Sequence, residues 1–216
     1  MAPRITTDTQ QVLDVFQPGL RRGAERLPYD PSKRYFYVEH PTEGWRVYLR
    51  AACFIHELSP WFDPQRFIVV KRTGAPGEAA SWEPPKGQME GKDDDPNKSL
   101  FDLLRENVRR EVAEEAKITM LRSIQHTGLV VQSVEPDFPP NTYFQYHIFS
   151  AYAHPRNIQA AFDEFQWIYE HPKAFARFRR DRREKDAIGW FDPVTTKLMG
   201  KWSPGIVAQY LASFRR

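Results

Sequence analysis

The residues of this chain best suited to chemistry form a run of six, REVAEE at positions 110–115, with three carboxylates and one guanidinium. An apolar pattern runs through the preceding segment at about 100° per residue, as on one face of a helix. That face is defined by Leu100, Leu104, Val108 and Ile118. By the same geometry, the side chains of Glu111, Glu114 and Glu115 fall within roughly 60° of its centre. A face that should be buried therefore becomes acidic near the end of the helix.

Buried carboxylates need a partner, because an unpaired charge is costly to bury. The C-terminal end of a helix also carries the wrong dipole for anions. The pattern therefore predicts a cation beside the three glutamates, and clustered oxygen ligands suit a hard divalent ion such as Mg2+. The alternative is a solvated helix face with surface salt bridges, which is the usual place of a charged run. The phasing of the glutamates argues against that alternative.

Two starts are open for this helix. One is Asp95, with Pro96 in the first helical position. The other is Ser99, with Asp102 three residues later as a capping pair. In both cases we expect the helix to end near Ala116.

Bulk properties bound the class of protein. The chain has 216 residues, 41% of them hydrophobic, with a mean hydropathy of −0.64, which is typical of a soluble globular protein. No apolar run approaches the ~18 residues of a membrane span, and no secretory signal is evident at the N-terminus, so no membrane partner is expected. The single cysteine, Cys53, excludes an intrachain disulfide and favours a cytoplasmic location. A net charge of +3 permits a polyanionic ligand without requiring nucleic acid.

The order of expected elements predicts an α+β fold with a mixed β-sheet sandwiched between helices. Residues 1–44 are rich in turn formers and are expected to be an N-terminal extension with at most short elements. Residues 45–216 are expected to be the main domain, with a charged helical insertion around 158–186. Strands are expected at 45–56, 67–71, 121–133, 142–153 and 188–191. A last helix is expected to be capped by Ser203 and Pro204 and to run to about 214.

The segment from Gly87 through Glu90 to the REVAEE run and Ile118 resembles the Nudix box, whose pattern is G-x5-E-x7-R-E-U-x-E-E-x-G-U, with U a bulky aliphatic residue. Nine extra residues separate Gly87 from Arg110, and Lys117 stands where the pattern has glycine. Four aspartates could stand in for the pattern's first glutamate: Asp93, Asp94, Asp95 and Asp102. The resemblance, with the strands around the box, covers roughly residues 45–215.

This resemblance implies a metal-dependent Nudix hydrolase that cleaves a nucleoside diphosphate linked to another moiety. It implies catalytic roles for Glu111, Glu114 and Glu115, with Arg110 orienting them through a salt bridge. Mg2+ or Mn2+ would be held by the three glutamates and the carbonyl of Gly87. A divalent ion would neutralise the polyphosphate and activate water. The general base is left open between Glu111, Glu115 and an acid outside the run.

The stretch WEPPKG at 82–87 is similar to the W-x-P-P-K-G stretch of asymmetric diadenosine tetraphosphate hydrolases in that family. A dinucleoside polyphosphate is therefore the leading substrate, with Lys86 facing its phosphates and Trp82, Tyr143 and Tyr146 as further substrate contacts. Each of these residues has a structural alternative. Lys86 could be an exposed lysine in a turn, Trp82 could anchor the loop to the core, and the two tyrosines could pack in the core. Because strand residues alternate, Tyr143 and Tyr146 lie on opposite faces, so at most one faces a ligand.

Two other functions are kept. Residues 171–186 combine seven basic side chains with Phe175 and Phe178, which makes RNA an alternative partner and mRNA decapping an alternative activity, against a plain solvated helix. A catalytically silent Nudix fold used for binding is the third hypothesis. His56 and His147 are interpreted as lone structural histidines and Cys53 as a core residue. The sequence leaves the oligomeric state open.

Overall fold

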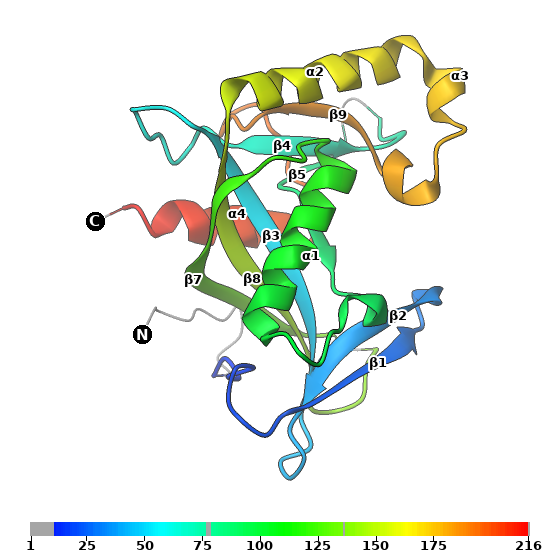
Figure 1. Ribbon diagram of the computed structural model, residues 1–216, viewed down its shortest axis with the longest axis vertical. Helices are drawn as coiled ribbons and strands as arrows, with labels where there is room; N and C mark the ends of the chain where they lie inside the picture. Colours follow the sequence, from blue (N-terminus) through cyan, green and yellow to red (C-terminus); the bar gives the residue numbers. More distant parts are fainter. Residues whose placement is uncertain (1–10, 77–78, 136, 216) are drawn as a thin grey trace. The chain divides into compact units, whose positions relative to one another are not determined.

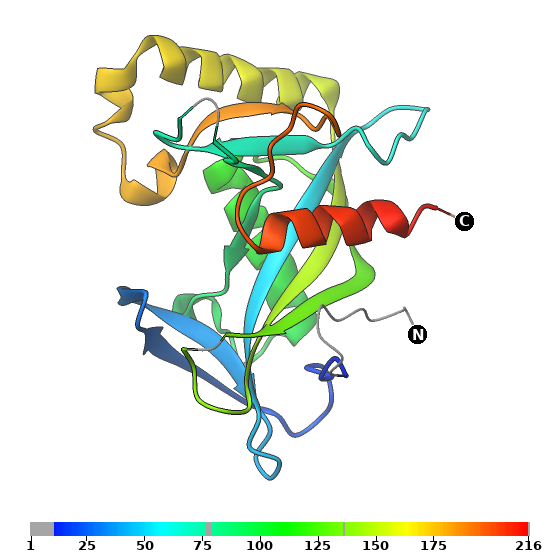
Figure 2. The same cartoon turned by 180° about the vertical axis from the view of Figure 1, so that it is seen from behind.

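The computed structural model describes residues 11–76, 79–135 and 137–215 and contains both strands and helices (Figure 1, Figure 2). The strands are β1 (Arg21–Leu27), β2 (Asp30–Glu39), β3 (Arg46–Glu57), β4 (Ile68–Arg72), β5 (Trp82–Glu83), β6 (Lys86–Gln88), β7 (Arg122–Val134), β8 (Thr142–Ala153) and β9 (Lys185–Trp190). The helices are η1 (Gly91–Asp93), α1 (Leu100–Glu115), α2 (Pro155–Glu170), α3 (Pro172–Phe175), η2 (Arg180–Arg183) and α4 (Trp202–Ala212). The predicted α+β class is confirmed.

The described residues divide into two compact units. Unit 1 consists of residues 11–52, 87–108 and 126–148, and unit 2 of residues 53–86, 109–125 and 149–215, each without the gaps given above. Four elements contribute residues to both units: β3, α1, β7 and β8. The domain boundary expected between positions 44 and 45 stays a prediction.

The larger sheet of the described residues has the strand order β1-β2-β3-β8-β7, with β6 also paired to β3. Strands β2 and β3 are antiparallel. Strands β3 and β8 run parallel, because the amide of Arg46 bonds the carbonyl of Asn141 at 2.9 Å while the amide of Leu58 bonds that of Ala153 at 2.8 Å. The sheet is therefore mixed, as the sequence predicts.

The expectation of at most short elements before residue 45 is wrong. Strand β1 has seven residues and β2 has ten, and the two form an antiparallel hairpin. Strand β2 also pairs with β3 and so extends the larger sheet. The turn formers that suggested a loop are accommodated locally. Gly23 lies opposite the ring of Tyr37, where an added Cβ would come within 2.5 Å of the ring. Pro31 lies near the first residue of β2, where a missing amide is tolerated.

A chain of hydrogen bonds in unit 1 connects two histidines to the segment before β1. The amide of Gly128 donates to Nδ1 of His126, whose Nε2 lies 3.1 Å from Nδ1 of His147. His147 continues to the Oε1 of Gln145 at 3.2 Å, and the Nε2 of Gln145 donates to the carbonyl of Leu13. His147 is therefore structural, as expected, but it is not a lone histidine.

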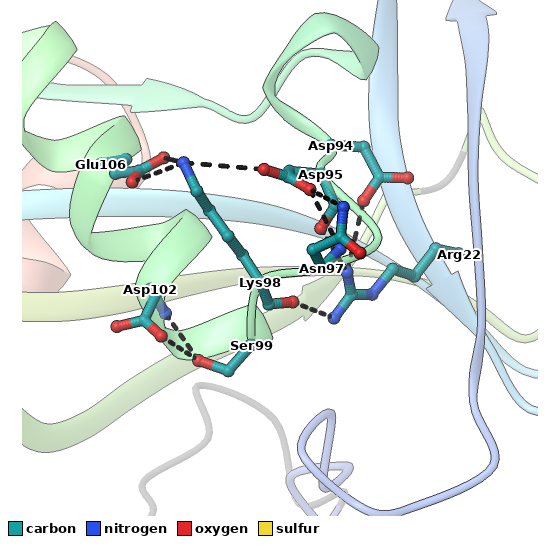
Figure 3. A network of polar contacts seen from close by, with 8 residues as sticks. All are labelled: Arg22, Asp94, Asp95, Asn97, Lys98, Ser99, Asp102 and Glu106. Carbon is teal, nitrogen blue, oxygen red and sulfur yellow. Dashed lines mark hydrogen bonds and ion pairs between the residues drawn. The ribbon is translucent and has the colours of Figure 1, made fainter.

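Helix α1 begins as the second alternative predicts. The hydroxyl of Ser99 accepts the amide of Asp102 at 3.1 Å and donates to its carboxylate at 2.6 Å. Arg22 of β1 holds the residues just before this cap in place, because its guanidinium donates hydrogen bonds to the carbonyls of Asp95 and Lys98 (Figure 3). Part of the nine extra residues is therefore an ordered connection.

Unit 2 contains the smaller sheet, with the order β5-β4-β9. Helix α2 lies along β9 in both views and packs on it through Phe165 and Ile168, which form a core with Phe175 of α3 (Figure 1, Figure 2). The helical insertion expected around 158–186 is therefore interrupted. Helix α2 ends at Glu170 because the residue before Pro172 is disfavoured in the helical region, and Lys185 already belongs to β9.

Helix α4 packs on β3 within unit 2. The ring of Tyr210 stacks on Phe54 with centroids 3.6 Å apart, and its hydroxyl lies 2.6 Å from Nε2 of His56. The Nδ1 of His56 lies 2.9 Å from the carbonyl of Arg66, so the ring is held neutral with its proton on Nδ1. In the described part of the chain, no helix is both long enough and apolar enough to cross a membrane.

We expect the stability of the protein to depend on pH through His56. Burial lowers the pKa of this imidazole, so below the unfolded value of about 6.5 the unfolded chain takes up a proton that the folded chain resists. The contribution of His56 to the free energy of unfolding should therefore be fully present above that pH and should decrease as the pH falls to 5. Urea denaturation at pH 7.5 and 5 should show a smaller fall for His56→Gln than for the wild type. Equal falls in both would contradict the assignment.

Candidate active site

The three glutamates lie on the last two turns of α1, within unit 2. Glu111 and Glu115 are only 8% and 3% exposed, and Glu114 is half-buried. They flank the fully buried Val112, so the acidic stripe and the apolar stripe share one face of the helix. The predicted burial of carboxylates at this end of α1 is confirmed for two of the three.

A buried lysine links α1 to both edges of the smaller sheet. The ammonium of Lys185, at the start of β9, lies 2.9 Å from Oε1 of Glu115 and also bonds Oε1 of Glu83 on β5. Lys86 completes the cluster: its ammonium lies 2.7 Å from Oε2 of Glu83, and its amide donates to Oε2 of Glu115 at 2.9 Å. Ser203 of α4 adds a hydroxyl to Oε2 of Glu83 at 3.2 Å. We call Glu83, Lys86, Glu115 and Lys185 the ion-pair cluster.

The electrostatics of the ion-pair cluster follow from burial and charge. Burial by itself would raise the pKa of Glu83, but Lys86 and Lys185 outweigh it and hold that pKa below its usual range. For Glu115 burial prevails over Lys185, so its pKa is raised. Burial would lower the pKa of Lys185, yet the two carboxylates outweigh it and the pKa is raised. The lysine thus stays charged between its two partners.

Arg110 binds the other two glutamates. Its guanidinium lies 2.9 Å from Oε1 of Glu111 and 3.2 Å from Oε2 of Glu114. The orienting salt bridge that the resemblance implies for Arg110 is therefore present. Burial nevertheless raises the pKa of Glu111 to about 8, with further contributions from the neighbouring glutamates. Glu111 thus has a raised pKa even though Arg110 is paired with it, because burial is the larger effect.

Lys117 ends the helix in a conformation that explains the glycine of the Nudix pattern. Its φ of +60° is in the left-handed region, which glycine adopts most easily after a helix. The lysine compensates with hydrogen bonds, since its ammonium donates to the carbonyl of Glu114 at 2.5 Å and to that of Arg182 at 3.0 Å. The departure from the pattern therefore keeps the backbone turn and ties the basic segment around η2 to the end of α1.

Of the predicted substrate residues, Lys86 joins the glutamates directly. Trp82 lies one residue from Glu83, half-buried, with its ring over Gly189 of β9 and its backbone bonded to Lys197 and Met199. Gly87 follows Lys86 in the chain and belongs to unit 1.

The two tyrosines also belong to unit 1. The guanidinium of Arg50 lies over the rings of Phe144 and Tyr146, so these two share one face of β8. Tyr143 therefore lies on the opposite face, as expected. Tyr146 is buried and Tyr143 half-buried.

The four aspartates considered for the first glutamate of the pattern have local partners in unit 1. Asp93 caps the amide of Glu90 at 2.7 Å, and Asp102 pairs with Ser99. Asp94 lies 3.4 Å from the guanidinium of Arg22, and Asp95 bonds Asn97. Each of these carboxylates thus takes part in organising the connection before α1, and Figure 3 shows the contacts of Asp94, Asp95 and Asp102.

The donor set suits a hard divalent cation, because three carboxylates lie on one helix end and two are buried there. In the described residues, however, no three carboxylate, histidine or cysteine groups are arranged around a common point where an ion could lie. Their oxygens are bound by Arg110, Lys185 and the amide of Lys86. The chemistry of the donors therefore fits a metal, and binding would require these cations to yield oxygens.

Sequence reasoning missed two members of the ion-pair cluster. Glu83 stands inside the WEPPKG stretch and is the acid outside the run that the structure brings to the glutamates. Lys185 gave no local signal, because it follows a long run of exposed basic residues and differs from them only in being 4% exposed. Only the packing of β9 against α1 and β5 distinguishes it.

The comparisons with known proteins are structural. A Nudix hydrolase from Nitrosomonas europaea matches with 15% identity and a TM-score of 0.39, over 77% of this chain and 89% of that one. An Ap4A hydrolase from C. elegans matches with 17% identity and a TM-score of 0.41, over 78% and 97%. NrtR of Shewanella oneidensis, solved with a 27mer DNA, matches with 14% identity and a TM-score of 0.45, over 76% and 61%.

No protein-family model matches the chain, and no curated protein matches it in sequence. Two of the three matched structures are named as hydrolases. At such identities and TM-scores, these likenesses do not assign an activity to this chain.

Removing Lys185 should strongly destabilise the protein. Lys185→Met leaves two buried carboxylates without their shared cation, and breaking a buried pair in this way costs about 3–5 kcal/mol. Lys173→Met, at an exposed lysine of α3, is the matched control and should change the free energy of unfolding by less than about 0.5 kcal/mol. Urea denaturation measures both.

A second variant tests the pairing itself. Adding Glu115→Gln to Lys185→Met removes one of the uncompensated charges, so the double variant should be more stable than Lys185→Met alone. Additive losses in the double variant would show that Lys185 and Glu115 do not interact.

Proposed function

We propose that the protein is a metal-dependent pyrophosphohydrolase of the Nudix type that cleaves a nucleoside diphosphate linked to another moiety. The observation that supports this most is the end of α1, where Glu111 and Glu115 are buried beside Glu114 and beside the lysines of the ion-pair cluster. Carboxylates that could bind a metal ion and lysines that could bind phosphate therefore lie next to each other at the end of α1. Hydrolysis of a polyphosphate uses both kinds of group.

In the proposed site, Glu111, Glu114 and Glu115 with the carbonyl of Gly87 would hold Mg2+ or Mn2+. Bound there, the ion would neutralise phosphate charge and lower the pKa of water. Arg110 keeps Glu111 and Glu114 oriented through its two ion pairs. Lys185 stabilises the negative form of Glu115 and, with Lys86, that of Glu83.

A dinucleoside polyphosphate is the proposed substrate. Lys86 supports it, since its side chain, at 15% exposure, is the more accessible cation of the ion-pair cluster and could exchange Glu83 for a phosphate oxygen. Trp82 is half-buried and lies four residues before Lys86 in the chain. It would contact the nucleoside. Tyr143 or Tyr146 would contribute from β8. The proposed location is the cytoplasm, where the buried thiol of Cys53 stays reduced.

The activity should depend on the buried glutamate. With Mg2+ or Mn2+ present, the wild type should hydrolyse at least one member of a panel of dinucleoside polyphosphates, capped RNA, nucleoside triphosphates, sugar nucleotides and diphosphoinositol phosphates. Glu115→Gln should lower kcat by at least about 100-fold, or roughly 2.7 kcal/mol in activation free energy. Glu170→Gln, at the exposed end of α2, should leave kcat unchanged.

Thermal unfolding of both variants shows whether a lost activity reflects a lost fold. Absence of turnover of every panel member by the folded wild type contradicts the proposal and favours a silent binding fold. Turnover that survives Glu115→Gln contradicts the proposed site.

A second candidate is the hydrolysis of an RNA-linked pyrophosphate, such as decapping. The basic segment before β9 adjoins the site, because the carbonyl of Arg182 accepts a hydrogen bond from Lys117 at the end of α1. Its arginines at 177, 179, 180 and 182 are exposed. The sequence suggested that Phe175 and Phe178 could contact bases. In the structure Phe175 is buried and Phe178 packs against the same core, so neither ring is available to a base. Any RNA contact would therefore be mainly electrostatic.

RNA binding through this segment should weaken steeply with salt, because each phosphate contact releases counterions. Replacing Arg179, Arg180 and Arg182 with glutamine should flatten the salt dependence, by about one unit of log–log slope for each lost contact. Replacing Arg21, Lys92 and Lys201, which are exposed and lie outside this segment, with glutamine is the charge-matched control. Equal slopes for the two triple variants in filter-binding assays would contradict the RNA candidate.

A further inference from the structure

A cavity of about 420 Å³ lies in unit 2 at the far end of β9 from the ion-pair cluster. Its lining comes from the N-terminal turns of α2, the end of β3, a residue two positions before β4 and the end of β9. The lining residues are Glu57, Arg66, Pro155, Arg156, Ile158, Gln159, Phe162 and Trp190. We call it the α2–β9 pocket. Its volume is in the range of about 300–1,000 Å³ that small-molecule sites occupy.

The first cation of the pocket is held in place by an aromatic ring. The guanidinium of Arg66 lies 4.0 Å from the centroid of Trp190. Stacking uses the flat face of a guanidinium and leaves its N–H donors directed outward in the plane. Within the described residues, the guanidinium of Arg66 makes no hydrogen bond or ion pair, so these oriented donors are available to a ligand.

The second cation stands at the start of α2. Arg156 follows Pro155, the first residue of this 16-residue helix, and its side chain makes no ion pair within the described part of the chain. The N-terminal end of the helix adds a partial positive charge at the same place. Two guanidiniums and a helix dipole outweigh the single carboxylate of Glu57, so the pocket favours an anionic group.

The remaining walls suit a flat apolar group that carries hydrogen-bond donors. The rings of Phe162 and Trp190 lie with their planes 30° apart and their centroids 6.4 Å apart, and Ile158 is buried beside them in α2. Glu57 and Gln159 supply oxygen acceptors at the rim. An aromatic ring with amino or hydroxyl groups would satisfy both surfaces.

We propose that the α2–β9 pocket binds a small ligand that combines a phosphate group with an aromatic ring system, of the nucleoside monophosphate class. Arg66 and Arg156 bind the phosphate, Phe162 and Trp190 contact the base, and Glu57 accepts hydrogen bonds from base or ribose. This is a binding site separate from the glutamates of α1. Trp190 lies five positions after Lys185 in β9, which is roughly 16 Å of strand.

The test is isothermal titration calorimetry on the full chain, with adenosine monophosphate and inorganic phosphate as probes and EDTA present. The wild type should bind adenosine monophosphate more tightly than phosphate. Arg66→Met and Arg156→Met should each raise the Kd for adenosine monophosphate at least tenfold, and Phe162→Leu should raise that Kd while leaving the Kd for phosphate unchanged. Arg21→Met, at an exposed arginine of β1 outside the pocket, is the matched control and should leave both unchanged.

The same measurement separates this pocket from the proposed active site. Glu115→Gln should bind adenosine monophosphate like the wild type, even though it should lose hydrolysis. Loss of binding in Glu115→Gln would place the ligand at the glutamates and overturn the proposal. Absence of binding by the wild type, equal affinity for phosphate, or an unchanged Kd in both arginine variants would also overturn it. Thermal unfolding verifies that each variant is folded.

Discussion

The site depends on one buried cation. Lys185 stands between Glu83 and Glu115, and all three residues are at most 4% exposed. An ammonium in this position offsets the cost of burying two carboxylates, and at Glu83 it shares that role with Lys86. It also joins three elements that are distant in the chain: β5, the end of α1 and the start of β9. The smaller sheet and the end of α1 are thereby held together by charge as well as by packing.

At the end of α1, three glutamates lie where the helix dipole disfavours negative charge, and nearby cations compensate for this. A helix C-terminus repels anions, yet three glutamates occupy its last two turns. Arg110 neutralises two of them from the same helix, Lys185 neutralises the third from β9, and Lys117 bonds a terminal carbonyl from its left-handed position. The cations that make this helix end stable are the groups that would exchange partners when a divalent ion or a polyphosphate binds.

Strand β9 serves both ends of unit 2. Its first residue supplies the lysine of the ion-pair cluster, and its last residue supplies the tryptophan on which Arg66 stacks in the α2–β9 pocket. The pairing of β9 with β4 fixes the separation of the two, from Lys185 opposite Arg72 to Trp190 opposite Ile68. A rigid strand between two polar sites keeps their geometries independent of loop motion.

Much of the fold was predictable where the signal was local. The strands at β3, β4, β7 and β8 follow continuous runs of β-branched and aromatic residues, and the Ser99–Asp102 cap follows from a four-residue pattern. Predictions were wrong where a local signal competes with tertiary contacts. Gly23 suggested a loop, although it gives space to the ring of Tyr37 inside a strand. Ser203 suggested a helix cap, but its hydroxyl bonds Glu83 while α4 begins one residue earlier.

The sequence by itself determined that α1 would bury its carboxylates, because helical periodicity depends only on spacing along the chain. The resemblance to the Nudix box implied that Arg110 would orient glutamates of the run, and the structure pairs it with Glu111 and Glu114, both within one helical turn. Only the tertiary structure decided which cation compensates Glu115, because Lys185 is 70 residues away and no different in type from the exposed basic residues before it. The α2–β9 pocket was likewise not predictable from the sequence, because its arginines and aromatic rings come from α2, from β9 and from the segment before β4. Spacing along a chain encodes the faces of single elements, whereas the choice of partners depends on which faces pack together.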